Sequence, residues 1–147
     1  MILEQTIQQA YKTLKESNIN SYQLDAEIIL SNIMGVTREF LITNNNHKVT
    51  RDVIQKYLIA IERRKRNEPV AYITGTKEFW SNDFMVNHDT LVPRPETELL
   101  IYKLISFYKT KKINILDIGT GSGCILLSLL LELKKAKGTG VDISSKA

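Results

Sequence analysis

Glycines recur at alternate positions in the segment "DIGTGSGC", where Gly119, Gly121 and Gly123 follow an apolar run. Glycine lets a chain turn tightly and lets a ligand approach the backbone, so the pattern is typical of a nucleotide-binding loop. Asp142 lies 19 residues after Gly123, at the end of a second apolar run. A carboxylate in that place can accept hydrogen bonds from both hydroxyls of a ribose. These residues predict a site for a ligand that carries a ribose.

The spacing of the glycines narrows the kind of ligand. It is G-x-G-x-G, with Asp117 two residues before Gly119, and not the G-x-G-x-x-G that cradles a pyrophosphate. We therefore interpret the segment as a loop for the adenosyl and methionine parts of S-adenosylmethionine. Asp117 either orients the loop or meets the ammonium of the methionine, and the sequence leaves both roles open. The residues assigned to the loop are Gly119, Thr120, Gly121, Ser122 and Gly123.

The segment "LVPRPETELL" stiffens the chain in front of an expected helix. Pro93 and Pro95 each fix their own φ and push the preceding residue into extended conformations, so residues 92–95 are expected to form a rigid arm. Glu96 or Thr97 then begins a helix that runs to about residue 109, because carboxylates are favourable at the positive end of a helix dipole. The arm is therefore expected to position something beside it.

Apolar residues spaced by three and four predict a bundle of four or five amphipathic helices over about the first 70 residues. The expected end signals are N-caps at Thr37 and Thr50, an Asn20–Gln23 capping box, and a stop at Gly35. The apolar residues expected on the buried faces are Leu3, Ile7, Ala10, Tyr11, Leu14, Leu24, Ile28, Ile29, Val53, Ile54, Tyr57, Leu58 and Ile61.

Beyond Pro69 the pattern changes toward strands. "KEFW" and "FMVN" flank "SND", which predicts a β-hairpin. Its aromatic residues Phe79, Trp80 and Phe84 are expected to pack between two domains, in preference to forming a platform for stacked bases. Farther on, a strand over 113–119, the glycine loop, an apolar helix and a strand over 138–143 form one βαβ unit.

Composition and charge exclude several classes of protein. The formal charge of +4 comes from 20 Lys and Arg against 16 Asp and Glu, divided evenly between the halves of the chain. The basic runs 63–66, 109–112 and 134–137 stand at expected helix ends, so we interpret them as solvated ends that oppose the dipole, in preference to RNA or ribosome contacts. The longest apolar run, 124–133, is too short to span a bilayer, and the N-terminus does not resemble a signal peptide.

Cys124 is the single cysteine, which excludes an internal disulfide framework and a zinc cluster and fits a reducing cytoplasm. It stands where the glycine loop enters the next helix, so we expect a small buried residue there. His47 and His88 lie alone in polar segments, and we assign no metal ligand.

Taken together, "FWSNDFMVNHDTLVPRPETELL", "ILDIGTGSGCI" and "GVDIS" closely resemble the HemK/PrmC family, and the resemblance extends to "LDAEIIL" and "EPVAYITGTKEFW". It implies methylation, with S-adenosylmethionine as cofactor, of the glutamine amide in the GGQ motif of class I peptide-chain release factors, in the cytoplasm. It also implies that the proline arm lies over the cofactor pocket, with Thr97 near the cofactor.

The resemblance implies an α/β, multi-domain fold. Residues 1–72 would form a helical substrate-recognition domain, residues 73–95 a β-hairpin and proline-rich linker, and residues 96–147 the first part of a Rossmann-like class I methyltransferase domain. No membrane contact and no direct binding of nucleic acid are expected, and association with the ribosome is left open.

The N-P-P-Y motif, which by the resemblance grips the substrate glutamine, is absent from the sequence. We therefore expect an N-terminal piece of a longer enzyme that is inactive alone, and we assign no catalytic residue. Two alternatives remain at this point. One is an amino-methyltransferase acting on adenine in nucleic acid, and the other is a non-catalytic module that docks on a release factor or ribosome.

Overall fold

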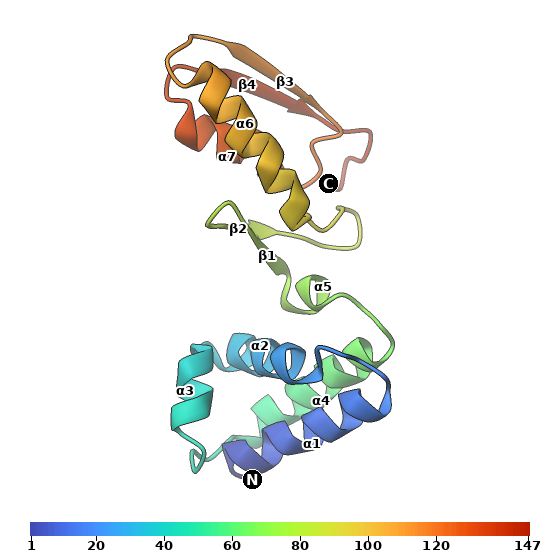
Figure 1. The fold of residues 1–147 in the computed structure, drawn as a ribbon. Helices are drawn as coiled ribbons and strands as arrows, with labels where there is room; N and C mark the ends of the chain where they lie inside the picture. Colours follow the sequence, from blue (N-terminus) through green and yellow to red (C-terminus); the bar gives the residue numbers. More distant parts are fainter. The chain divides into compact units, whose positions relative to one another are not determined.

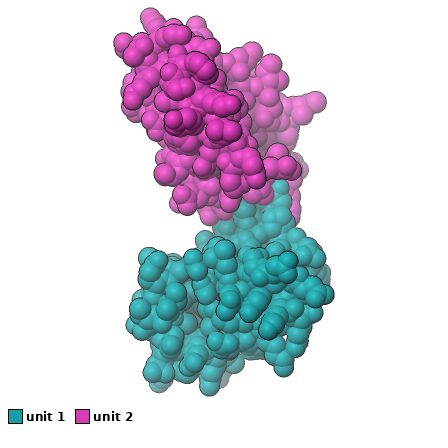
Figure 2. All heavy atoms as spheres, viewed as in Figure 1, with its two compact units in different colours: residues 1–74 teal, residues 75–147 magenta.

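The chain forms two compact units in a computed structural model that describes residues 1–147. They comprise residues 1–74 and 75–147, coloured teal and magenta in Figure 2. Each unit contains a hydrophobic core made of its own residues, so each is described by itself.

The first unit is helical (Figure 1). Its elements are α1 (Leu3–Glu16), α2 (Tyr22–Met34), α3 (Arg38–Thr43), α4 (Arg51–Lys65) and α5 (Val70–Thr74). Helices α1, α2 and α4 pack against one another, and their apolar faces form the core. The buried residues of this core are Leu3, Ile7, Ala10, Leu14, Ile19, Ala26, Ile29, Leu30, Leu41, Val49, Tyr57, Ala60 and Ile61.

Three of the predicted helix ends are confirmed. The hydroxyl of Thr37 accepts a hydrogen bond from the N–H of Phe40 at 3.3 Å, and that of Thr50 accepts one from Val53 at 3.4 Å. Both hydroxyls satisfy an N–H that has no partner within its helix. Gly35 ends α2 with a φ of +65°, a conformation that costs glycine little.

The predicted Asn20–Gln23 capping box is wrong. Helix α2 begins at Tyr22, and its N-cap is Ser21, whose side chain makes no capping hydrogen bond. The Ser21 hydroxyl instead donates to Oδ2 of Asp25 at 2.7 Å, within the buried edge of the helix. A carboxylate one helical turn farther on thus competes with the cap for this hydroxyl.

Two of the leucines expected on buried faces are exposed. Leu24 and Leu58 keep 44% and 46% of their surface in solvent, because the buried stripes of α2 and α4 include the small residues Ala26 and Ala60 instead. The stretch after Pro69 also begins with a short helix, α5, before the strands. The change from helix to strand therefore comes later than the sequence pattern indicates.

The second unit mixes helices and strands. It contains β1 (Thr76–Phe79), β2 (Asn82–Met85), the 3-10 helix η1 (Pro95–Thr97), α6 (Glu98–Tyr108), β3 (Asn114–Ile118), α7 (Cys124–Glu132) and β4 (Lys137–Val141). Strands β1 and β2 are antiparallel, whereas β3 and β4 are parallel and are connected through α7 (Figure 1). The predicted hairpin and the βαβ unit are both present.

The hairpin differs from the prediction in two ways. Its turn consists of two residues, Trp80 and Ser81, because Phe79 pairs with Asn82. Phe79 and Phe84, which were expected between two domains, are buried in the core of the second unit, their rings edge to face with centroids 6.2 Å apart. The hairpin is therefore part of the unit that carries the glycine loop.

Helices α6 and α7 pack on one another and cover the face of β3 that carries Ile115. Helix α7 lies close to β4, because a Cβ added at Gly138 would lie 2.5 Å from Cδ1 of Leu126. The neighbouring residues on β3, Leu116 and Ile118, are 62% and 78% exposed on the other face. None of the helices combines the length and apolarity needed to cross a bilayer.

Candidate functional site

The glycine loop connects β3 to α7 in a conformation that needs glycine. Gly119, Gly121 and Gly123 have φ values of +80°, +52° and +75°. Residues with a Cβ rarely adopt such values, so the three glycines are dictated by the path of the backbone. The N–H groups of Gly119 and Thr120 both donate to the carbonyl of Val141, at 2.8 and 3.0 Å, and fix the loop to the end of β4.

Asp117 orients the loop from the end of β3. Its Oδ2 accepts a hydrogen bond from the hydroxyl of Thr120 at 2.8 Å. The same hydroxyl would lie 2.8 Å from a Cβ placed on Gly140, so Thr120 packs directly against the backbone of β4. Of the two roles left open by the sequence, loop orientation is the one that corresponds to an observed contact.

Asp142 joins the end of β4 to the centre of the loop. Its Oδ2 accepts from the N–H of Gly121 at 2.8 Å, and its Oδ1 accepts from the N–H of Ser144 at 2.9 Å. The N–H of Ser144, followed by that of Gly121, holds the pKa of the Asp142 carboxyl below its usual value. Each carboxylate oxygen keeps another lone pair, and the side chain is exposed, so it remains able to accept hydrogen bonds from a ligand.

A cavity of about 630 Å³ opens beside the loop, within the second unit. This volume lies in the range of roughly 300–1,000 Å³ that small-molecule sites occupy. Gly121 and Ser122 line one side of the cavity. On another side lie residues from β2 and the segment that follows it: Asp83, Phe84, Met85, Val86, Asn87 and Thr90.

The wall formed by residues 83–90 was not assigned to the site from the sequence. Its shape depends on a turn in which the Thr90 hydroxyl accepts from the N–H of Asn87 at 3.1 Å and donates to its carbonyl. The Asn87 side chain also accepts from the N–H of Asp89 at 2.8 Å. Asn, Asp and Thr within four residues are the signal of such a turn, and they could have identified it.

Thr97, which the resemblance assigns to the cofactor, does not line this cavity, and neither do Gly119, Thr120, Gly123 and Asp142. It ends η1, where its N–H donates to the carbonyl of Arg94 at 3.0 Å, and it precedes α6 without capping it by its side chain. Arg94 is extended, as its place between the two prolines predicts. The structure therefore brings Gly121, Ser122 and Asp142 together and leaves Thr97 outside the group.

Cys124 lies at the first position of α7, buried in the core, and burial raises the pKa of its thiol. A thiol that resists ionisation is a poor nucleophile, so Cys124 is a packing residue. No group of three or more His, Cys, Asp and Glu side chains is gathered to hold a metal ion.

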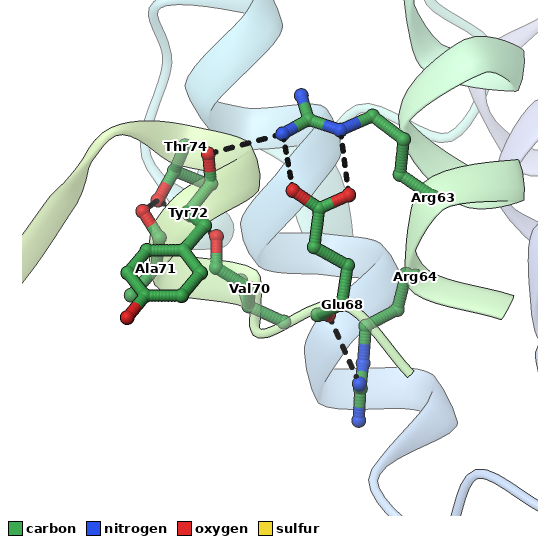
Figure 3. A network of polar contacts seen from close by, with 7 residues as sticks. All are labelled: Arg63, Arg64, Glu68, Val70, Ala71, Tyr72 and Thr74. Atoms are coloured by element: carbon green, nitrogen blue, oxygen red, sulfur yellow. Dashed lines mark hydrogen bonds and ion pairs between the residues drawn. The ribbon is translucent and has the colours of Figure 1, made fainter. Parts of the chain in front are cut away.

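The basic run 63–66 is only partly a solvated helix end. Arg63 forms a bidentate ion pair with Glu68 and also donates to the carbonyl of Tyr72 (Figure 3). Arg64 donates to Asp25 at 2.7 Å and to the carbonyl of Glu68 at 3.1 Å. Both guanidinium groups are therefore engaged in contacts within the first unit, so they do not form a free basic patch for nucleic acid.

Comparisons with known proteins show which sequences this chain resembles. Residues 5–75 match the family described as PrmC N-terminal domain. A "Release factor glutamine methyltransferase" from Koribacter versatilis is 40% identical over 100% of this chain and 53% of its own length. One from Caulobacter vibrioides is 39% identical over 91% of this chain and 47% of its own length.

A longer relative, a "Bifunctional methyltransferase" from Rickettsia bellii, is 36% identical over 94% of this chain and 30% of its own length. The chain thus spans about half the length of the release factor glutamine methyltransferases that it matches, and a smaller share of the bifunctional protein. The similarity includes both the helical unit and the unit with the glycine loop.

Proposed function

We propose, from the premise that this chain belongs to the family of the release factor glutamine methyltransferases, that it is the N-terminal part of an enzyme of this activity. The substrate is the glutamine side-chain amide in the GGQ motif of class I peptide-chain release factors, and the cofactor is S-adenosylmethionine. The observation that carries the proposal is the cavity lined by Gly121 and Ser122, whose loop is hydrogen-bonded to Asp142.

The residues at this cavity fit S-adenosylmethionine. Asp142, which is hydrogen-bonded to the loop beside the cavity, would offer carboxylate lone pairs to the two ribose hydroxyls, and Gly121 in the cavity wall carries no side chain that would exclude the ligand from the backbone. When bound, S-adenosylmethionine supplies a methyl group attached to a sulfonium, which is an electrophile. Asp117 keeps the loop in shape through Thr120, and the segment 83–90 forms part of the cavity wall.

We assign substrate recognition and methyl transfer to different domains of the chain. We assign residues 1–72 to the substrate-recognition domain and residues 96–147 to the start of a Rossmann-like class I methyltransferase domain. The hairpin and proline arm between them, within residues 73–95, belong to the second unit. The parallel β3–β4 pair connected through α7 supports the Rossmann-like assignment. Thr97 remains a candidate cofactor contact through the resemblance alone. We place the enzyme in the cytoplasm, where its release-factor substrate acts.

The amide nitrogen of glutamine is a weak nucleophile, since its lone pair is delocalised into the carbonyl. Its alignment with the methyl group is therefore the main task of the site. In the 147 residues no N-P-P-Y motif is present to accept the amide hydrogens. We therefore expect this chain alone to transfer no methyl group.

The test is methyl transfer by the full-length gene product with radiolabelled S-adenosylmethionine. A class I release factor is expected to become labelled, whereas the same protein with the GGQ glutamine replaced by alanine is expected to stay unlabelled. Parallel reactions contain DNA or RNA, and another contains the 147-residue chain as enzyme. Labelling of nucleic acid alone would contradict the proposal and identify the protein as an adenine methyltransferase. If no substrate became labelled, the alternative of a non-catalytic binding module would be favoured.

A further inference from the structure

The hairpin turn holds two residues in an unfavourable backbone conformation. Trp80 and Ser81 have φ values of +51° and +56°, although both carry a Cβ. Two-residue hairpin turns of this kind favour Asn-Gly, because a positive φ brings Cβ close to a carbonyl oxygen, a clash that glycine lacks and asparagine tolerates. A turn built from Trp and Ser persists only where the surrounding structure holds it.

Two carboxylates hold this turn. The N–H of Trp80 donates to Oε1 of Glu98 at 2.8 Å, and its indole Nε1–H donates to Oε1 of Glu132 at 3.0 Å. Glu98 is the first residue of α6 and Glu132 the last residue of α7. One tryptophan therefore connects the hairpin to the ends of both helices that cover the β3–β4 sheet.

The contact matters because the hairpin forms a wall of the cavity. A two-stranded hairpin is only marginally stable by itself. Its strand β2 contains the first residues of the segment 83–90, which lines the cavity together with Gly121 and Ser122. The apolar anchors Phe79 and Phe84 lie in the core on the same strands. Movement at the turn would displace β2, and with it the wall.

We infer that Glu98 and Glu132 are positioning residues that clamp the Trp80–Ser81 turn and thereby hold the 83–90 wall of the cavity. The role of this clamp in cofactor binding rests on the proposed function. Glu98 contributes more, because it holds a half-buried backbone N–H, whereas the bond between Glu132 and the indole is exposed to water. Glu98 thus has a task beyond the favourable placement of a carboxylate at a helix N-terminus.

The variants separate these effects. Glu98→Ala removes the acceptor, Glu98→Gln keeps an acceptor oxygen without the charge, and Glu132→Ala releases the indole. Glu96→Ala is the matched control, because Glu96 is an exposed carboxylate two residues earlier in the same segment. Any general effect of a lost carboxylate near the start of α6 will appear in this control as well.

The first readout is independent of activity. Trp80 is the single tryptophan of the 147-residue chain, so its fluorescence reports only on the turn. In Glu98→Ala we expect the accessibility of Trp80 to acrylamide to rise, and the amide exchange of the β1–β2 hairpin to accelerate by about tenfold. Glu98→Gln should bring the quenching of Trp80 and the amide exchange of the hairpin most of the way back to the wild-type values. Glu96→Ala should behave as the wild type.

The second readout is cofactor binding and kinetics in the full-length gene product. Calorimetry with S-adenosylmethionine should show affinity about tenfold lower in Glu98→Ala and about twofold lower in Glu132→Ala. The KM for the cofactor should rise while the KM for the release factor stays unchanged. The circular dichroism melt identifies any variant that does not fold, and Glu98→Gln then provides the comparison.

The outcomes distinguish the clamp from the proposed function. Unchanged fluorescence, exchange and affinity in both Glu98 variants would overturn the clamp and leave the function standing. Looser hairpins with unchanged cofactor affinity would overturn the positioning role. If the wild-type enzyme does not bind S-adenosylmethionine while Glu98→Ala still loosens the hairpin, the proposed function fails and the clamp stands as a holder of the cavity wall.

Discussion

At the scale of single residues, Asp142 combines two tasks that the sequence had presented as one. The sequence places it at the end of a strand, where a ribose-binding acid is expected. The structure adds hydrogen bonds from the N–H groups of Gly121 and Ser144. The carboxylate therefore shapes the loop independently of any ligand, and by our proposal its replacement affects both the loop and cofactor binding.

We predict that Asp142→Ala in the full-length gene product weakens S-adenosylmethionine binding by on the order of tenfold to a thousandfold. The reason is the loss of charge-assisted hydrogen bonds to the ribose and of the acceptor for Gly121. Asp142→Asn should lose less affinity for S-adenosylmethionine than Asp142→Ala, because the amide oxygen of asparagine still accepts one hydrogen bond. Calorimetry measures both affinities, and equal binding by wild type and Asp142→Ala would remove Asp142 from the site.

The pH dependence of binding follows from the same hydrogen bonds. Because the pKa of Asp142 is lowered, its carboxylate stays ionised throughout the neutral range. Its contribution is present in full above the ordinary aspartate pKa of about 3.9 and is lost as the pH falls through the lowered value. The measured affinity should therefore show no step from Asp142 between about pH 5 and 8. A step in this range that disappears in Asp142→Asn would contradict the assignment.

Ser128 offers an independent prediction about stability. It lies in α7, is fully buried, and its hydroxyl makes no hydrogen bond. A buried hydroxyl without a partner costs stability, so Ser128→Ala should raise the free energy of unfolding by about 1 kcal/mol. Ser106→Ala is the control, because Ser106 is exposed on α6 and its hydroxyl donates to the carbonyl of Lys103. Urea denaturation showing an equal gain in both variants would assign the gain to helix propensity alone.

At the scale of elements, local signals succeeded where their partners are close in sequence. Thr37 and Thr50 cap helices by reaching an N–H three residues on, and Gly35 ends one by its own backbone freedom. The predicted box at Asn20 failed because the buried Asp25 competes for the neighbouring hydroxyl of Ser21. Asp25 lies only four residues after Ser21, but its carboxylate also accepts from Arg64 of α4, a contact that the local pattern does not contain.

Asp25 forms a buried ion pair that connects α2 to α4. The side chain of Asp25 is 9% exposed, and its carboxylate accepts hydrogen bonds from Ser21 and from Arg64 at the end of α4. Removal of one partner from a buried ion pair leaves a charge without compensation. We predict that Arg64→Ala lowers the free energy of unfolding of the first unit by about 3 kcal/mol.

Arg66→Ala is the matched control for this variant, because Arg66 is an exposed cation of the same basic run. Arg66→Ala should change the free energy of unfolding by no more than about 0.5 kcal/mol relative to the wild type. Both are measured by urea denaturation followed by circular dichroism. Similar small effects at Arg64 and Arg66 would mean that the Asp25 pair contributes nothing measurable.

At the scale of the whole molecule, the sequence predicted one half of the candidate site and missed the other. The glycine loop and Asp142 were found because their spacing within one βαβ unit is itself the signal. The wall at residues 83–90 was missed, because its place depends on the burial of Phe84 and on the contact of Trp80 with Glu98. Those contacts join segments far apart in sequence, and no local periodicity reveals them.

The two units also differ in how completely their elements bury apolar surface. The first unit has a contiguous core from α1, α2 and α4. In the second unit, Leu116 and Ile118 on β3 are 62% and 78% exposed, and Ile143 just beyond β4 is fully exposed. Because burial of apolar surface is the main favourable term in folding, the first unit should be the more stable of the two.

We predict that residues 1–74, produced alone, fold into a helical domain and unfold cooperatively. Their core, caps and ion pairs lie within the segment, although a domain of this size buries only about 60% of the surface of its unfolded chain and is marginally stable. Circular dichroism of the fragment should show a helical spectrum and a sigmoidal melt. In the intact chain, amide exchange should open the β3–β4 sheet at lower free energy than α1, α2 and α4. A fragment without a cooperative melt, or a sheet protected better than the helices, would show that the first unit depends on the second for its stability.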